Sequence, residues 1–279
     1  MSEVEETGPY GGHSLEERFD RRVEMNVPDR HNPQLREFIE RVNADDDLYA
    51  TWLAANVNAI ERLQMSDHGP VHVKIVMNIG IRILRLLMDG GVQPSIVTNY
   101  KMSPHDAEVI VAAACLLHDT GMSIHRADHE SFSLFLANGK LRELLDGLYD
   151  TRTQAVMRSE ILHAIIAHRA GGKPLTLEAG VVRIADALDM AKGRSRIPFA
   201  QGSVSIHSIS AAAIEAVHIE QGQDKPVRLR IEMSNSAGVF QLDQLFRDKL
   251  GGSGLEPYIE LEALIEGEGE KRLFQSFRL

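Results

Sequence analysis

An apolar stretch without a single polar interruption, Val109–Leu117, ends abruptly in the dipeptide His118-Asp119. Because none of its positions suits water, we expect a helix that other helices surround on all sides. Ser103 and Pro104 form a typical helix start, an N-cap followed by proline at the first helical position. A buried helix therefore carries an imidazole and a carboxylate to its C-terminal end, which is costly unless a bound cation compensates.

Apolar residues recur at helical spacing along most of the first 200 residues. They predict helices over Asn32–Val42, Asp45–Leu63, Pro70–Gly90, Leu141–Leu148 and Thr151–Arg169, and from Thr176 onward. A further helix should open at His129 and carry Phe132, Phe135 and Leu136 on one side. The polar segment Thr120–Asp128 is expected to be a loop, and residues 1–30, which lack periodicity, a flexible tail.

Near residue 200 the hydrophobic period changes from that of helices to that of strands. Val227–Met233 and Ile259–Ala263 alternate strictly between apolar and polar residues, and Leu273–Phe277 is a candidate last strand. Val239–Leu250 between them fits an amphipathic helix. We therefore expect a mainly α protein, with an all-helical domain over residues 31–200 and a small α+β domain over residues 201–279. The boundary should fall near residues 197–203.

The composition and charge of the chain argue against several classes of protein. The chain of 279 residues carries 30 Lys and Arg against 40 Asp and Glu, a net charge of −10, which argues against a broad surface for nucleic acid or anionic membranes. The apolar stretch is far too short to cross a bilayer, and the acidic N-terminus resembles no signal peptide. The single cysteine, Cys115, lies in the predicted buried helix and should be a core residue. We expect a cytoplasmic protein.

Eight of the twelve histidines crowd into one part of the helical region: His68, His72, His105, His118, His125, His129, His163 and His168. Several lie at predicted helix ends, where side chains from different helices can converge. A mixed set of imidazoles and carboxylates suits Mn, Fe, Co, Ni or Zn, with Mg possible at a position rich in carboxylates. We therefore expect a divalent metal, one or two per chain.

The order His72, His118-Asp119 and Asp186 resembles the metal motif of the HD-domain superfamily of metal-dependent phosphohydrolases. The strings that carry the resemblance are DHGPVH, LLHDTGMSIHRADHE, IIAHRAGG and VVRIADALD, within residues 66–192. The resemblance implies an all-helical fold and the hydrolysis of phosphomonoesters or phosphodiesters. The GYP motif and the adjacent histidines of one phosphodiesterase branch are missing, which argues against cyclic dinucleotides as substrates.

The resemblance also implies roles for individual residues. One metal would be held by His72, His118, Asp119 and Asp186, and Asp119 would bridge to a second metal. Candidate ligands of that second metal are His129, His163 and His168. Because His163 and His168 diverge by roughly 140° on a regular helix, we expect only one of them to face the metal. Asp119, His118 and His125 are the catalytic candidates.

Some candidates keep two interpretations. His68 is either a substrate-binding residue or a partner of a ligand, and Asp189 either supports a ligand or lies on the helix surface. The basic cluster Lys192, Arg194 and Arg196 either binds substrate phosphates or is a solvated helix end that the helix dipole favours.

These residues predict a metal-dependent phosphohydrolase that acts on a nucleotide or another small phosphorylated substrate. The alternatives are a non-catalytic module that binds a metal and a nucleotide, and an enzyme that hydrolyses a different bond at the same metal. We expect neither nucleic acid nor membrane as a partner. The strands of the C-terminal domain could pair across a dimer or build a regulatory pocket, and we expect a homo-oligomer. All candidate ligands precede residue 190, so a chain ending near Gln201 should keep some hydrolysis.

Overall fold

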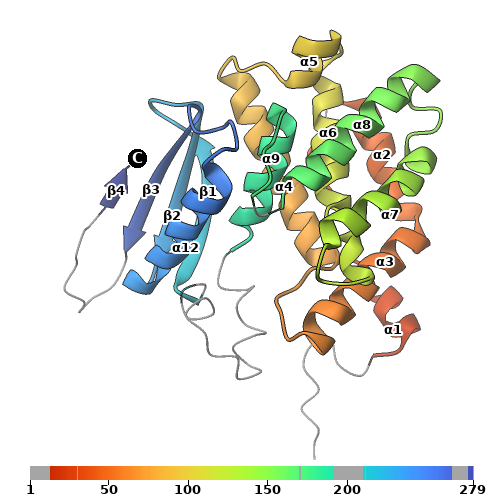
Figure 1. Ribbon diagram of the computed structural model, residues 1–279, viewed down its shortest axis with the longest axis horizontal. Coiled ribbons are helices and arrows are strands. Elements are labelled where there is room, and N and C mark those ends of the chain that lie inside the picture. The colour runs from red at the N-terminus through yellow and green to blue at the C-terminus, as the bar shows by residue number, and fades with distance from the viewer. Residues whose placement is uncertain are drawn as a thin grey trace, which may run out of the picture.

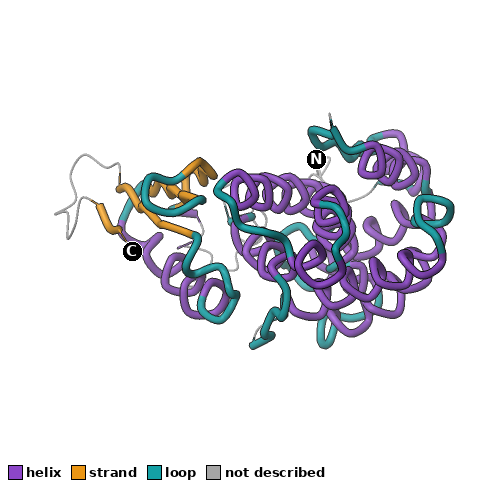
Figure 2. The backbone as a smooth tube through the Cα atoms, turned by 90° about the horizontal axis from the view of Figure 1, so that it is seen from above, coloured by secondary structure: helices purple, strands orange, loops and turns teal. Residues whose placement is uncertain are grey.

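The computed structural model describes residues 13–29, 31–169, 171–190, 210, 212–265 and 276–278. It consists of a helical domain and a small α+β domain beside it, as both views show (Figures 1 and 2). The predicted fold class is thus confirmed. The α-helices of the first domain are α1 (Leu15–Asp20), α2 (Pro33–Ala44), α3 (Asp46–Asn56), α4 (Pro70–Asp89), α5 (Ser95–Tyr100), α6 (Pro104–Leu117), α7 (His129–Leu144), α8 (Thr151–Ala167) and α9 (Leu177–Leu188).

Helix α6 is the centre of the helical domain, as its apolar sequence predicts. Its start is fixed by a capping box, in which Ser103 Oγ accepts a backbone N–H while the Asp106 carboxylate accepts the N–H of Ser103. Every residue from Asp106 to Leu117 is buried, and helices α2, α4, α8 and α9 pack around it. The close approach of α4 depends on Gly80, because a Cβ there would lie 2.9 Å from Val111 Cγ1.

The segment after α6 differs in part from its prediction. Thr120–Ser123 forms a 3₁₀ turn, η2, instead of an open loop. Ser133 of α7 holds this turn, because its Oγ donates to the carbonyl of His118 and accepts the N–H of Gly121. A side chain at Gly121 would collide with the backbone of α7. A small residue, Ser133, therefore lies on the buried side of α7 where η2 packs against it.

The predicted end of α7 is wrong, and one of its phenylalanines is exposed. Phe135 is 77% exposed, whereas Ser133 and Ala137 of the same helix are buried. No separate helix spans Leu141–Leu148, because α7 continues to Leu144 and the chain then turns through Gly147 at φ +71°. Positive φ suits glycine and ends the helical path.

The tail prediction is wrong for residues 13–29, and residues 1–12 lie outside the described part. Ser14 and Glu17 form a capping box at the start of α1. Met25 is buried, and its backbone N–H and carbonyl both bond to the side chain of Asn43 in α2. Tertiary partners order this segment although it lacks helical periodicity.

The C-terminal domain contains a four-stranded sheet in the order β1-β2-β3-β4. Its strands are β1 (Ile214–Gln221), β2 (Val227–Met233), β3 (Ile259–Ile265) and β4 (Ser276–Arg278). β2 and β3 are parallel, and the two outer pairs are antiparallel. The crossover between β2 and β3 consists of a 3₁₀ turn η3 (Ser236–Gly238), helix α12 (Val239–Gln244) and a π-helical turn η4 (Leu245–Leu250).

The two domains share one hydrophobic core, in which the C-terminal domain packs against α4 and α9 (Figure 1). The contact is close: a Cβ on Gly90 would lie 2.6 Å from Pro226, and a Cβ on Gly180 would lie 2.5 Å from the carbonyl of Ser253. The predicted domain boundary lies outside the described residues. Within the described ranges, no helix has both the length and the apolar composition that crossing a bilayer requires.

Candidate metal centre

Five helices bring titratable side chains to one place in the helical domain. His72 lies in the first turn of α4 and His68 just before it, His118 and Asp119 end α6, and His129 begins α7. His168 caps the end of α8, and Asp186 lies in the last turn of α9. The structure therefore brings together seven of the residues that the sequence singles out: His68, His72, His118, Asp119, His129, His168 and Asp186.

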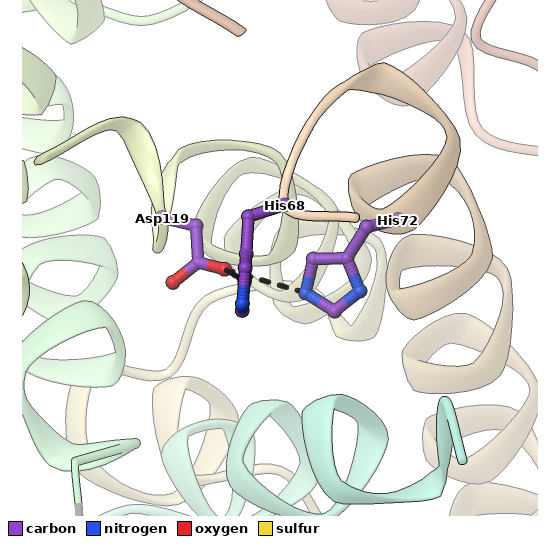
Figure 3. A group of neighbouring side chains, drawn as sticks. All are labelled: His68, His72 and Asp119. Atoms are coloured by element: carbon purple, nitrogen blue, oxygen red, sulfur yellow. Dashed lines mark hydrogen bonds and ion pairs between the residues drawn. The ribbon is translucent and has the colours of Figure 1, made fainter. Parts of the chain in front are cut away.

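Asp119 is at the centre of this group, and its oxygen Oδ2 faces three imidazoles. His68 Nδ1 lies 2.8 Å from it, and the Nε2 atoms of His72 and His118 each lie 3.4 Å from it. Figure 3 shows His68 and His72 on the same side of the carboxylate. Asp119 is only 3% exposed, so these imidazoles replace water as its partners.

The other oxygen of Asp119 faces a second set of histidines. Oδ1 lies 3.2 Å from His129 Nε2 and 3.9 Å from His168 Nε2. Glu130, the next residue in α7, belongs to a possible ligand group with these two histidines. One carboxylate thus separates two clusters of nitrogen and oxygen donors.

Asp186 closes the first cluster from the opposite side. Its Oδ1 lies 3.6 Å from His72 Nε2 and 3.7 Å from His118 Nε2. The possible ligand atoms of these three residues lie within 4.8 Å of one another. Two carboxylates and two imidazoles therefore converge in the arrangement that the sequence resemblance implies.

The Nδ1 atoms of three histidines are bound to acceptors, which fixes their tautomers. His118 Nδ1 donates to the carbonyl of Cys115 at 2.8 Å, and His168 Nδ1 donates to the carbonyl of Ile165. His72 Nδ1 lies 2.6 Å from Asp189 Oδ2. A neutral imidazole that donates through Nδ1 keeps a lone pair on Nε2. In all three residues Nε2 is therefore the atom that can bind a metal.

The buried Nε2 of His118 tests whether a metal fits this site. It makes no hydrogen bond to any residue that the structure describes, and a buried polar atom without such a partner is costly. The atom points toward the carboxylates of Asp119 and Asp186. A divalent cation among these donors would satisfy the nitrogen and both carboxylates, so the residues fit a metal.

The charges of the site agree with that fit. Burial favours the neutral form of Asp119, but the positive charge of His118 and His68, when these rings are protonated, holds the pKa of its carboxyl well below the usual value. The pKa of the Asp186 carboxyl is also lowered, mainly by the Lys249 ammonium, although burial alone would raise it. Burial and the nearby His118 lower the pKa of His168 to about 3. At neutral pH the site thus offers ionised carboxylates and a neutral His168 imidazole, the forms that bind metals.

Two predicted site residues are not brought to the cluster. His163 is half-buried, and its Nε2 accepts the N–H of Leu175 at 3.0 Å, so the prediction of a ligand role is not supported for this residue. It diverges from His168 on the same helix, as the helical spacing predicts. His125 is exposed, and its Nδ1 accepts the N–H of Ala127. The basic cluster at residues 192, 194 and 196 lies outside the described part.

The structure places the carboxylate of Asp189 against the ring of His72. Of its two interpretations, support for a ligand is the one the structure favours, because the carboxylate accepts from His72. A carboxylate behind a metal-binding imidazole fixes the ring and raises its basicity.

One residue of the site could not be inferred from the sequence. Lys249, in η4 of the C-terminal domain, places its Nζ 3.1 Å from Asp186 Oδ2. It is separated from Asp186 by 63 residues, and no motif surrounds it. The C-terminal domain therefore contacts the cluster at Asp186, while continued hydrolysis by a chain that ends near Gln201 stays a prediction.

Comparison with known proteins agrees with this geometry. A family model described as the HD domain matches residues 71–191, a range that includes His72, His118, Asp119 and Asp186. The uncharacterized protein MJ1020 of Methanocaldococcus jannaschii is 41% identical over 214 residues, which cover 77% of this chain and 83% of that protein. With that likeness and with the HD-domain match, the chain belongs to the HD superfamily of metal-dependent phosphohydrolases.

Proposed function

We propose that this protein is a hydrolase that uses its histidine–aspartate cluster to cleave a phosphate ester, with a nucleotide as the expected substrate class. The observation that carries the proposal is the shared orientation of His72, His118 and His168. Each ring binds an acceptor through Nδ1 and turns Nε2 toward the carboxylate of Asp119. Such a converging set of lone pairs is suited to a metal rather than to proton transfer alone.

The proposed ligands of one divalent metal are His72, His118, Asp119 and Asp186. A metal in such a set supplies Lewis-acid chemistry, because it acidifies water and offsets negative charge on phosphoryl oxygens. Imidazole-rich sets suit Mn, Fe, Co, Ni and Zn, and carboxylates also admit Mg. Asp189 would keep the His72 ring in its binding orientation, and His68 would orient the Asp119 carboxylate through their 2.8 Å contact.

Replacing Asp189 by alanine is expected to weaken Mn²⁺ binding by about 10- to 100-fold, because the His72 ring loses the partner that fixes its tautomer. Calorimetric titration of the metal-free protein with Mn²⁺ measures the effect. Asp89→Ala is the matched control, since Asp89 is exposed at the far end of the same helix as His72. Equal Mn²⁺ affinities for Asp189→Ala and the parent would mean that Asp189 does not contribute to metal binding.

A second metal is part of the proposal. Its support is Asp119 Oδ1, which faces His129 and His168, with Glu130 as a further possible donor. The double variant of His129 and His168 to alanine should reduce the metal content from two ions per chain to one, as measured by elemental analysis. His163→Ala is the control, because this residue of α8 points away from the cluster. One ion per chain in the parent, unchanged in the double variant, would refute the second site.

Release of inorganic phosphate tests the function itself. Metal-stripped protein, with and without Mn²⁺, is offered a panel of nucleoside mono-, di- and triphosphates and simple phosphate esters. We expect phosphate release that depends on Mn²⁺. A protein that binds Mn²⁺ and a nucleotide without turnover would instead be a non-catalytic sensing module. Turnover of only non-phosphate substrates would point to a different hydrolysis at the same centre.

The remaining parts of the proposal depend on sequence patterns. A cytoplasmic location, a small phosphorylated substrate and a homo-oligomer stay predictions, as do substrate contacts of Lys192, Arg194 and Arg196. The net charge of −10 supports a small substrate over nucleic acid. A role of His125 in catalysis would require it to reach the cluster from its exposed turn.

A further inference from the structure

Lys249 connects the C-terminal domain to the metal centre. Its ammonium nitrogen lies 3.1 Å from Asp186 Oδ2 and donates to the carbonyl of His168 at 3.1 Å. The Lys249 side chain is 22% exposed, so most of it is buried between α8 and α9. A largely buried ammonium with two fixed acceptors is held in one orientation, unlike a lysine on an open surface.

We propose that Lys249 is a positioning residue of the metal centre, through which the C-terminal domain sets the orientation of Asp186. This inference rests on the proposed metal-binding role of Asp186. It adds a group from outside the range that the family model matches, since that match ends at residue 191.

The two oxygens of Asp186 have separate partners, and this division carries the inference. Oδ2 is bound by Lys249, whereas Oδ1 faces His72 Nε2 at 3.6 Å and His118 Nε2 at 3.7 Å. With Oδ2 held, rotation of the carboxylate is restricted and Oδ1 stays directed toward the two imidazoles. The ammonium also offsets the cost of keeping this carboxylate ionised away from bulk water.

The backbone of Lys249 is fixed as firmly as its side chain. Arg183, one turn before Asp186 in α9, is 2% exposed and donates through Nε to the carbonyl of Lys249 at 3.0 Å. Its Nη1 donates to carbonyls just before and after His168, those of Ala167 and Arg169. Arg183 of α9 therefore ties η4 to the C-terminal end of α8.

Two opposite effects on metal binding can be expected from a lysine here. Repulsion between the ammonium and a bound cation would weaken binding, whereas a fixed ligand strengthens it. The carboxylates of Asp119 and Asp186 offset the charge of a divalent ion, which reduces the repulsion. Loss of the partner that orients a ligand typically costs 10- to 100-fold in metal affinity. Orientation should therefore dominate over repulsion.

The test compares Mn²⁺ affinity in full-length variants, measured by calorimetric titration of metal-stripped protein. Lys249→Met should weaken Mn²⁺ binding by about 10-fold or more, and Lys249→Arg, which keeps the charge, should restore most of it. Lys225→Met is the matched control, because Lys225 belongs to the same domain and also donates to two backbone carbonyls, those of Glu256 and Ile259, which belong to no residue of the cluster. Circular dichroism checks that each variant is folded.

An Mn²⁺ affinity of Lys249→Met equal to or tighter than that of the parent would overturn the inference, as would an equal loss in Lys225→Met. A loss that Lys249→Arg does not restore would also contradict it. The proposed function fails separately, if the parent binds Mn²⁺ but releases no phosphate from any substrate. A parent that binds no Mn²⁺ would overturn both.

Discussion

Replacing Asp119 by asparagine is expected to abolish metal binding and phosphate release together. Asparagine has nearly the same shape but only one oxygen and no charge, so neither cluster around this residue keeps its carboxylate. Lewis-acid assistance is worth several kcal/mol, and each 1.36 kcal/mol is a factor of ten, so we expect a loss of at least about a thousandfold in kcat. Elemental analysis and phosphate release measure the two losses on the same sample.

The control for this prediction is Asp89→Asn, the same chemical change at an exposed position that ends α4. It should leave metal content and turnover as in the parent. Full metal content with full turnover in Asp119→Asn would show that the cluster is not the catalytic centre.

Arg183→Met should have the largest effect on stability. The guanidinium of Arg183 donates to carbonyls of Ala167, Arg169, Gly172 and Lys249. Methionine fills similar space but removes the donor that these carbonyls share, although the carbonyl of Arg169 keeps the N–H of Gly172. Each buried group left unsatisfied costs roughly 1–3 kcal/mol. We expect the free energy of unfolding to fall by about 3 kcal/mol or more, as measured by urea denaturation with far-UV circular dichroism.

Arg36→Met serves as the comparison for Arg183→Met. Arg36 pairs with Asp29 at 2.9 Å, but its side chain is 51% exposed. An exposed ion pair contributes about 0–1 kcal/mol, so the change should be small. Equal losses in the two variants would mean that Arg183 does not hold the domains together.

The parts of the fold that local patterns determine could be predicted from the sequence. Ser103 and the apolar stretch behind it specify α6, and strict alternation specifies β2 and β3, all as observed. Strand β1 has no such strict alternation, and its register with β2 shifts between Ile214 and Ala216. The short helix α5 begins where the Glu178 carboxylate accepts the N–H groups of Ser95 and Ile96. Such a partner, more than 80 residues away, leaves no local pattern.

Only those site residues that belong to a motif or follow a helical spacing could be predicted from the sequence. The dipeptide His118-Asp119 points to the centre, and the spacing of His163 and His168 shows that only one can face it. Lys249 is different, because an isolated lysine in an amphipathic helix looks like any surface residue. Only the packing of η4 on α9 brings it to Asp186.

The central claim is that these side chains form a metal centre, and anomalous scattering from a crystal grown with Mn²⁺ tests it most directly. We predict a peak within bonding distance of His72 Nε2, His118 Nε2, Asp119 and Asp186. Crystals of protein that requires Mn²⁺ for hydrolysis, but with the peak elsewhere and none among these four residues, would contradict it.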